Sequence, residues 1–343
     1  MSRTRSSRYS VAVMAVSFAI TALAAIPQTV SAQPSSGSQF QPDGGGASYL
    51  AEETGLTLRE VEANGVRLSV ATGGDADGPA LLLVHGFLGN AYTWNEVAPL
   101  LAEDYQLVVP DMRGYGGSEI TDEGYDGQTL AADFAKLMET LGHDAYHVMA
   151  FDMGAPPALL LAANHPDRVE TLTYLEEPTM LPGLIADKIE MTPEDTAYGG
   201  LWWWMVAYSP SMTEVIVEDN ERDFLSWFYD NYAVVEGAVD DRARAIYTAD
   251  LTGPRQIHGW FGVYRELFET IEQTVPLEED KVTTPILAIG GAESQGLDVP
   301  EDLRRVATDV TGHSLEGTAH FLAEEKPEEL VRLFEEFVDR QQP

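Results

Sequence analysis

Apolar and polar residues alternate in two adjoining stretches that follow the first fifty or so residues. The alternation runs over residues 56–61 and again over residues 66–70, with Asn64-Gly65 between them. A strand with one buried face has this two-residue period, and Asn-Gly is a strong signal for a tight hairpin turn. The pattern therefore predicts a β-hairpin, and we expect the folded core to begin near residue 56.

Farther along the chain, short apolar runs alternate with stretches of helical periodicity. Residues 80–84 are apolar throughout and residues 106–109 nearly so, as expected of strands buried on both faces of a sheet. Helical patterns cover residues 94–101 and 129–141. Strands and helices that alternate through short connections predict an α/β fold, with a doubly wound and mostly parallel sheet.

The stretch 146–166 predicts a buried strand, one sharp turn and a helix. The turn has Ala150 at its start, Asp152 at its centre and Gly154 at its end. Small residues at both ends let the strand and the helix approach closely, which pushes the central side chain out at the edge of the sheet. A carboxylate at the start of a helix stays ionised and can attack a saturated carbon. The alternative is that Asp152 merely caps the helix.

Between residues 178 and 284 the pattern changes to helices that are rich in aromatic residues. Aromatic clusters lie at 201–205 and 224–229, and nothing in the segment extends the sheet. We expect a helical cap over the carboxyl ends of the strands, where open α/β sheets bind ligands. The segments 56–177 and 285–343 would then form the core domain.

The first 32 residues have the composition of a targeting segment. Three arginines precede an apolar run from Val11 to Ile26, and the small-residue site Val30-Ser31-Ala32 follows. This order predicts a cleaved signal peptide over residues 1–32, with an uncleaved anchor as the alternative. The next residues are rich in Ser, Gly, Gln and Pro, which predicts a flexible leader over residues 33–55. We expect a secreted or periplasmic protein without a stable membrane anchor.

The charge balance excludes one class of partner. The 343 residues include 56 Asp and Glu against 20 Lys and Arg, for a formal net charge of −36. A protein that binds nucleic acid needs a basic surface, so this balance argues against such a partner. It is consistent with a strongly hydrated, salt-adapted surface, and we expect salt to stabilise the fold by screening the repulsion between like charges. The absence of cysteine excludes disulfides and thiolate metal sites.

Three motifs occur in an order that is more specific than any one of them. They are His85-Gly86-Phe87, the run DMRGYGGS over residues 111–118, and the turn around Asp152. Together they resemble the α/β-hydrolase fold, in the branch that holds epoxide hydrolases and haloalkane or haloacetate dehalogenases. The resemblance extends from Leu56 to the C-terminus. It implies an enzyme in which Asp152 forms an ester with its substrate, and no metal or organic cofactor takes part.

The resemblance also assigns supporting roles around this nucleophile. The backbone N–H groups of Phe87 and Met153 would form the oxyanion hole that holds the ester oxygen. His85, Asp111 and Arg113 would brace the neighbouring loops and take no part in the chemistry.

An ester on a carboxylate needs a base that activates water, and this base is usually a histidine. His320 matches the family motif Gly-x-x-His, counted from Gly317, and the sequence predicts that residues 318–322 open the last helix. The acid that orients it is predicted to be Glu176, because residues 174–178 resemble the Tyr-x-Glu-x-Pro pattern of bacterial epoxide hydrolases. Glu293, after the next predicted strand, is the alternative. Glu177 is predicted to lie at the rim.

The cap is predicted to supply the groups that stabilise the leaving oxygen. Tyr264, directly before an arginine, resembles the family's cap tyrosine, which donates a hydrogen bond to the leaving oxygen or halide. A second donor in epoxide hydrolases is a tyrosine or a histidine, whereas here the matching position falls on Trp203 or its neighbour. An indole N–H donates one hydrogen bond but gives up no proton. His258 is a further, weaker candidate for a side chain that faces the pocket.

These residues predict hydrolysis of epoxides to diols through an ester on Asp152. The tryptophan near position 203 favours the alternative, a haloalkane or haloacid dehalogenase with the same triad, because indoles bind halides well. Met153 and Phe87 argue against it, since dehalogenases carry Trp or Arg after the nucleophile and haloalkane dehalogenases carry Asn in the oxyanion loop. A binding protein that has lost its activity is a third reading. In each case we expect a small-molecule partner and a monomer or a homodimer.

Overall fold

Eight strands among the described residues form a single sheet in the order β1-β2-β4-β3-β5-β6-β7-β8. The structure is a computed structural model and describes residues 45–189, 202–209 and 211–341. Neighbouring strands run parallel except that β2 is antiparallel to both β1 and β4. The strands are β1 (Thr57–Ala63), β2 (Val66–Gly74), β3 (Ala80–Val84), β4 (Gln106–Pro110), β5 (Tyr146–Phe151), β6 (Val169–Leu175), β7 (Ile286–Gly291) and β8 (Val310–Leu315). The predicted α/β fold with a doubly wound, mostly parallel sheet is confirmed.

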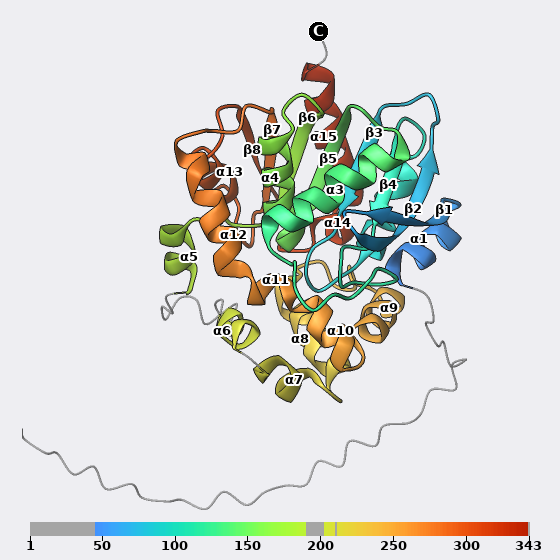
Figure 1. Ribbon diagram of the computed structural model, residues 1–343, viewed down its shortest axis with the longest axis vertical. Helices are drawn as coiled ribbons and strands as arrows, with labels where there is room; N and C mark the ends of the chain where they lie inside the picture. Colours follow the sequence, from blue (N-terminus) through green and yellow to red (C-terminus); the bar gives the residue numbers. More distant parts are fainter. Residues whose placement is uncertain (1–44, 190–201, 210, 342–343) are drawn as a thin grey trace, which may run out of the picture. The chain divides into compact units, whose positions relative to one another are not determined.

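Helices cover both faces of this sheet (Figure 1). Helices α3 and α4 lie on the face toward the viewer, and α15 lies behind the sheet. Their bounds are α2 (Ala98–Leu101), α3 (Gly127–Leu141), α4 (Ala155–Asn164), α13 (Asp298–Leu303), α14 (Leu322–Glu325) and α15 (Pro327–Gln341). The apolar stripe of α15 is buried, whereas its other face carries ion pairs such as that between Arg332 and Glu329.

Local sequence signals explain where several of these elements begin and end. Asn64 and Gly65 both have positive φ, as a hairpin turn of the type predicted there requires. The Asp126 carboxylate accepts a hydrogen bond from Thr129 N and caps α3, and Gly142 ends that helix in the left-handed conformation. The helix predicted over residues 94–101 is interrupted, with a 3₁₀ turn at Ala91–Trp94 before α2.

The predicted leader is shorter than its composition indicates. Residues 1–44, which include the predicted signal peptide, lie outside the described residues. Residues 46–54, however, form helix α1 (Gly46–Thr54), with Ala47 and Leu50 fully buried. The Ala47 N–H donates to both carboxylate oxygens of Asp111 at 3.1 Å, which attaches α1 to the core. The expectation of a flexible segment up to residue 55 is therefore wrong for residues 46–54, because their small and apolar side chains pack into the hydrophobic core.

In its described residues, the segment between β6 and β7 consists of helices and the loops that join them. Its elements are α5 (Pro182–Ile189), α6 (Trp202–Tyr208), α7 (Met212–Val217), α8 (Glu221–Tyr232), α9 (Asp241–Leu251), α10 (Pro254–Trp260), α11 (Gly262–Arg265) and α12 (Leu267–Thr274). We call this segment the cap. No helix in the described parts of the chain combines the length and the apolar character that are needed to cross a membrane.

Hydrogen bonds attach the cap to the loops at the carboxyl ends of the strands. The Tyr229 hydroxyl of α8 donates to Leu88 O at 2.6 Å, and the Tyr115 hydroxyl donates to Trp260 O of α10 at 2.7 Å. Asp250 of α9 accepts from Asn90 Nδ2 at 3.0 Å and from Gly116 N at 2.8 Å. These contacts explain why α8, α9 and α10 lie across the strand ends in Figure 1.

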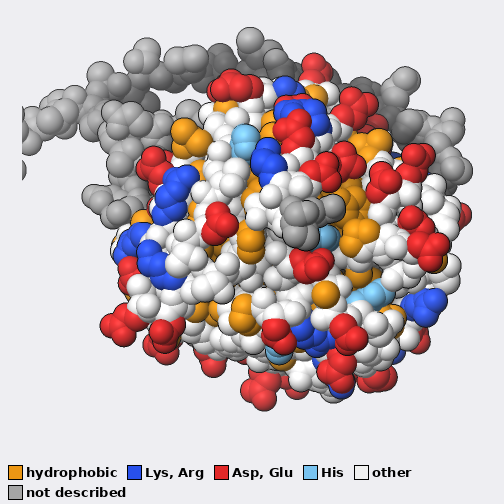
Figure 2. Space-filling view, turned by 90° about the horizontal axis from the view of Figure 1, so that it is seen from above, with side chains coloured by type: hydrophobic (Ala, Val, Ile, Leu, Met, Phe, Trp, Pro, Cys, Tyr) orange, Lys and Arg blue, Asp and Glu red, His pale blue; other side chains and the backbone are white. Residues whose placement is uncertain are grey.

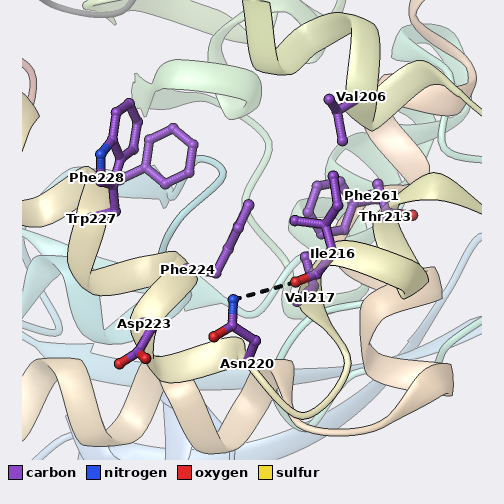
Figure 3. Close-up of a pocket in the computed structure, with 10 residues that line it drawn as sticks. All are labelled: Val206, Thr213, Ile216, Val217, Asn220, Asp223, Phe224, Trp227, Phe228 and Phe261. Carbon is purple, nitrogen blue, oxygen red and sulfur yellow. Dashed lines mark hydrogen bonds between the residues drawn. The ribbon is translucent and has the colours of Figure 1, made fainter. Parts of the chain in front are cut away.

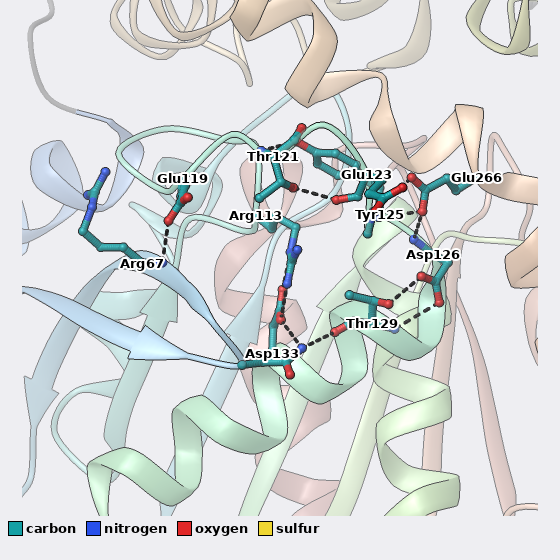
Figure 4. Close-up of polar contacts among 12 residues, drawn as sticks. Arg67, Arg113, Glu119, Thr121, Glu123, Tyr125, Asp126, Thr129, Asp133 and Glu266 are labelled. Atoms are coloured by element: carbon teal, nitrogen blue, oxygen red, sulfur yellow. Dashed lines mark hydrogen bonds and ion pairs between the residues drawn. The ribbon is translucent and has the colours of Figure 1, made fainter.

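A second polar network braces the loop that precedes α3 (Figure 4). The Glu266 carboxylate accepts hydrogen bonds from the backbone N–H groups of Gly124, Tyr125 and Asp126. Arg113 forms a buried two-point ion pair with Asp133 of α3.

The surface is strongly acidic, and Figure 2 shows acidic side chains spread over the visible face rather than gathered in one patch.

Candidate active site

Asp152 lies at the sharp turn between β5 and α4. Its φ is +47°, a left-handed conformation that is unusual for a residue other than glycine. The turn depends on two glycines, because a Cβ atom at Gly154 would lie 2.2 Å from His85 O, and one at Gly86 would lie 2.4 Å from Asp152 Cβ. The sheet thus holds Asp152 in a strained backbone conformation that only small neighbours permit, as the sequence pattern predicts.

One oxygen of the Asp152 carboxylate is held by the loop after β3. Phe87 N donates a hydrogen bond of 2.7 Å to Asp152 Oδ1, and both residues are buried. Met153, the other predicted oxyanion-hole residue, follows Asp152 in the 3₁₀ turn Asp152–Gly154 and is also buried. Oδ1 therefore has a fixed position next to a backbone donor, which leaves Oδ2 as the oxygen that can react.

His320 faces that second oxygen. Its Nε2 lies 3.4 Å from Asp152 Oδ2, and its ring packs against the ring of Phe151 at 4.9 Å between centroids. The residue lies in the loop between β8 and α14, and the helix begins only at Leu322. Of the residues 318–322 predicted to open the last helix, only Leu322 is helical, and the helix it begins is the short α14 that precedes α15 (Pro327–Gln341).

Glu176 lies on the opposite side of the His320 ring. It follows β6, is fully buried, and its Oε1 lies 4.0 Å from His320 Nδ1. Two backbone donors of the loop after β7 hold its carboxylate, Gly291 N at 2.5 Å and Gln295 N at 3.2 Å. The alternative acid, Glu293, lies in the same loop, but its side chain is exposed. That loop therefore contributes N–H groups to the site, and Glu176 is the carboxylate next to His320.

The ionisable side chains of Glu176 and His320 affect each other's pKa, and the charge of Asp152 also acts on His320. Burial raises the pKa of Glu176 to about 7, against the opposing effect of His320. Burial alone would lower the pKa of His320, but its hydrogen bond with Asp152 and the charges of Asp152 and Glu176 raise it above its ordinary value. A proton on the imidazole is therefore stabilised by a carboxylate on each side, as a general base requires.

Tyr264 lies in α11 above the oxyanion loop. Its side chain is fully buried, and its ring packs edge-on against that of Phe87 at 4.9 Å between centroids. Burial and the charge of Asp152 raise the pKa of Tyr264 well above its ordinary value. The phenol is therefore protonated at neutral pH and is close enough to Asp152 to respond to its charge.

The structure describes the ring of only one of the two tryptophans considered for the second cap donor. Trp203 lies in α6, and its side chain is outside the described residues. The ring of Trp204 is buried and lies 5.8 Å from that of Tyr264. Adjacent residues of a helix point about 100° apart, so a one-residue error of alignment selects a different side chain. His258 is directed elsewhere, since its Nε2 lies 3.2 Å from Thr121 O.

The residues expected to brace the loops have contacts that suit that role. His85 Nε2 accepts from Met112 N at 3.0 Å, its Nδ1 lies 2.8 Å from Gly86 O, and burial lowers its pKa to about 4. The imidazole is thus neutral and links two loops. Asp111 is fully buried and accepts from Ala47 N, Ala91 N and Gly117 N.

The structure also shows a buried charge that the sequence does not reveal. Glu177 was expected at the rim, yet it is only 3% exposed. Its charge contributes to the raised pKa values of Tyr174 and Tyr264, so it lies near the predicted proton donor. A glutamate between a buried strand and Pro178 carries no sequence signal of burial, which explains the error.

The cap contains an apolar pocket of about 240 Å³ between α6, α7 and α8 (Figure 3). Val206, Ile216 and Phe224 are among its wall residues, and the exposed residues Asn220 and Asp223 also line it. Phe261 forms part of the wall, and its ring also packs against Phe87 at 5.0 Å. A single aromatic residue therefore contacts both the pocket and the oxyanion loop.

A metal ion has one candidate position within the described parts of the chain. Asp126, Glu266 and Glu269 have carboxylate oxygens close enough together to share a cation. Two of the three carboxylates already accept hydrogen bonds, Glu266 from the loop before α3 and Asp126 from Thr129. Neither Asp152 nor His320 belongs to this group.

Comparisons with known proteins agree with this geometry. A family model described as the alpha/beta hydrolase fold matches residues 79–199. The chain is 31% identical to a soluble epoxide hydrolase of Corynebacterium sp. strain C12, over 81% of this chain and 96% of that protein. It is 30% identical to a fluoroacetate dehalogenase of Burkholderia sp., over 83% and 94%. The solved structure of the epoxide hydrolase CorEH superposes with a TM-score of 0.75 at 26% identity, over 84% and 100%.

Proposed function

Because the chain belongs to the α/β-hydrolase fold family, in the branch of epoxide hydrolases and fluoroacetate dehalogenase, it is a hydrolase, and we propose that it converts epoxides to diols through an ester on Asp152. The observation that carries the proposal is the asymmetry of one carboxylate. Asp152 Oδ1 accepts from Phe87 N at 2.7 Å, whereas Oδ2 lies 3.4 Å from His320 Nε2. One oxygen is bound to a donor and the other faces a base, as a nucleophile that is later regenerated requires.

In the first step Asp152 Oδ2 attacks a carbon of the epoxide ring. A new bond forms between carbon and Oδ2, the bond between that carbon and the ring oxygen breaks, and the electron pair moves to the oxygen. The oxygen takes the phenolic proton of Tyr264. Formation of the ester removes the charge of Asp152, which is one cause of the raised pKa of Tyr264, so the phenol becomes a better acid as the alkoxide develops.

In the second step water cleaves the ester. His320 takes one proton from the water, the hydroxide adds to the Asp152 carbonyl carbon, and the N–H groups of Phe87 and Met153 stabilise the negative charge on Oδ1. The intermediate collapses, and the departing alkoxide takes the proton from His320. The second water proton, left on the regenerated carboxyl group, returns to the Tyr264 phenolate. Glu176 orients His320 and stabilises its charged form.

Dehalogenation by the same carboxylate is the second candidate. The similarity to a fluoroacetate dehalogenase and the indole of Trp204 beside Tyr264 favour it. Met153 weighs against it, because the residue after the nucleophile brings neither the charge that a haloacetate carboxylate needs nor an indole for a halide.

The first test is a panel of epoxides and haloalkanes, with diol and free halide assayed separately and Asp152→Ser as the control. We expect diol from the unaltered protein and a loss of at least about 10³-fold in the variant. Halide without diol would make the protein a dehalogenase. No reaction with either class would favour a binding protein.

A single turnover in ¹⁸O-labelled water tests the ester itself. With enzyme in excess, the water oxygen should enter the Asp152 carboxylate, and the diol should carry only the oxygens of the epoxide and of Asp152. Mass spectrometry of the peptide that contains Asp152 measures this. Label in the diol alone would mean that water attacks the epoxide directly.

A further inference from the structure

A buried glutamate just beyond His320 holds the loop that carries it. Glu325 belongs to the short helix α14 and is only 6% exposed. Its Oε1 accepts hydrogen bonds from the two backbone N–H groups that flank His320, those of Ala319 at 3.0 Å and Phe321 at 3.1 Å. One oxygen atom thus fixes the chain on both sides of the predicted base.

The second oxygen of the same carboxylate binds the cap. Glu325 Oε2 accepts from Val234 N at 2.8 Å and from Val235 N at 3.1 Å. These residues lie two and three positions beyond the end of α8, the cap helix that ends at Tyr232. His320 N adds a third link by donating to Tyr232 O at 3.0 Å. The base and the end of the cap helix are therefore joined by one side chain and by one direct backbone hydrogen bond.

We propose that Glu325 is a positioning residue, which holds His320 in register with Asp152 and couples that register to the cap through the backbone after α8. The proposal rests on the proposed function. A carboxylate has about four acceptor sites and no donor, so it can satisfy four converging N–H groups at once. No neutral side chain of the same shape can do so. The residue touches no reacting atom and acts through His320.

This role makes the two half-reactions respond differently. Ester formation uses Asp152 and Tyr264, neither of which Glu325 contacts among the described residues. Ester hydrolysis needs His320 in place, and a small displacement of a catalytic group can cost about 100-fold in rate. A defect at Glu325 should therefore slow the second step and leave the first nearly unchanged, so that the ester accumulates.

The chain offers a matched control in the neighbouring glutamate. Glu324 lies in the same helix, where burial raises its pKa to about 8; the Tyr247 hydroxyl lies 3.4 Å from its Oε1, and no described backbone N–H around His320 donates to its side chain. Replacing Glu324 alters a neighbouring carboxyl group of the same helix without removing the link between the loop and the cap.

The decisive experiment compares Glu325→Gln with Glu324→Gln in a single turnover on an epoxide. An amide keeps one acceptor oxygen but presents a donor to the other pair of N–H groups, so it can hold one segment only. We expect Glu325→Gln to slow ester hydrolysis by roughly 10- to 100-fold, with the alkylated Asp152 peptide visible by mass spectrometry. The Glu324→Gln protein should accumulate no ester.

The pH profile of the hydrolytic step provides a second readout. The ionised groups that face His320 are Asp152, Glu176 and Glu325, and each raises the pKa of the imidazole. Activity is lost as pH falls through this pKa, because the base becomes protonated. Removal of the Glu325 charge should therefore move the acid limb to lower pH, while Asp152 and Glu176 remain to limit the shift.

Hydrogen exchange tests the link without any substrate. In Glu325→Gln, and more strongly in Glu325→Ala, exchange should accelerate at residues 234–235 and 319–321 together. Unchanged exchange and an unchanged hydrolytic rate in a folded Glu325→Gln protein would overturn the proposal. If the unaltered protein makes no diol, the proposed function fails, whereas the exchange result still decides whether the link exists.

Discussion

The two sides of the site are built in different ways. On the sheet side, Asp152 and Glu176 are held by backbone donors, Phe87 N for the first and Gly291 N for the second. On the cap side, Tyr264 is positioned by packing of its ring against those of Phe87 and Trp204. Backbone groups at the ends of parallel strands have positions that the sheet dictates, whereas packed rings move whenever a neighbouring side chain changes.

This difference suggests a division of labour. The strand ends hold the groups whose relative positions the proposed reaction depends on, namely the Asp152 carboxylate, the Phe87 N–H group and the Glu176 carboxylate next to His320. The cap supplies apolar surface and the phenol of Tyr264, and its pocket near Phe261 has walls that substitution can reshape. We therefore expect changes on the sheet side to abolish the reaction or the fold, and changes in the cap to alter the step rate or the substrate range.

The largest effect should follow Gly154→Ala. The added Cβ would lie 2.2 Å from His85 O, a backbone atom at the end of β3 that cannot move alone. We expect a loss of about 2–3 kcal/mol in the free energy of unfolding, measured by denaturant titration. Gly183→Ala in α5 is the control, because nothing lies within 4 Å of its added methyl group, and it should leave stability unchanged or slightly higher. Equal losses in both variants would refute the argument from the turn.

On the cap side, Tyr264→Phe should have the largest effect on rate. The ring and its packing remain, but the proton donor is lost, and we expect ester formation to slow by about 100-fold. Trp204→Phe keeps an aromatic ring beside Tyr264 and should cost less than about 10-fold. Rapid-quench measurement of the first turnover separates the two. A larger loss in the tryptophan variant would transfer the donor role to the indole.

Glu176→Gln should change the pH dependence and leave the ester step intact. The Glu176 charge raises the pKa of His320, so its removal lowers that pKa and moves the acid limb of ester hydrolysis to lower pH. The rate at the plateau should fall by roughly 10-fold, because the imidazolium loses a stabilising charge. An acid limb that stays in place would show that Glu176 does not act on His320.

Filling the cap pocket should affect substrate choice alone. Ile216→Trp places a large ring in the pocket wall, and we expect KM to rise by a few-fold for epoxides with bulky apolar groups, with small epoxides unaffected. Val215→Trp on the same helix is the control, since Val215 is 77% exposed. Equal effects of both variants would mean that substrates do not enter the pocket.

The smallest effect concerns the surface shared by both regions. The net charge of −36 makes like charges repel in the folded state. We expect the melting temperature to rise by a few degrees between low salt and about 1 M sodium chloride, because the Debye length falls to about 3 Å. A flat response in thermal melts would remove the hypothesis of a salt-adapted surface.

Much of the sheet side was predictable because its signals are local. Three local patterns each indicate the backbone conformation of their own segment. They are the turn residues Asn64-Gly65, the all-apolar run at 80–84 and the small residues around Asp152. The approach of Asp152, His320 and Glu176 was implied by the resemblance to the α/β-hydrolase fold, with Glu293 as the alternative acid. Their catalytic roles stay predictions.

The cap and the supporting contacts were less predictable. The pattern of α6 does not decide between Trp203 and Trp204, and no local signal marks Glu177 as buried. Residues 46–54 have the composition of a leader, yet Ala47 finds a partner in Asp111, 64 residues away.

By itself, the sequence determined the order of strands and helices, the sharp turn at Asp152, the chemical types at the site and the acidic surface. Periodicity, glycine positions and charge can be read from residues that are close in the sequence, without knowledge of the fold. Only the tertiary structure showed that the ring of Trp204 lies beside that of Tyr264 and that Glu325 joins the His320 loop to backbone about 90 residues earlier in the chain. Such contacts depend on which distant segments the fold brings together, and no spacing along the chain encodes them.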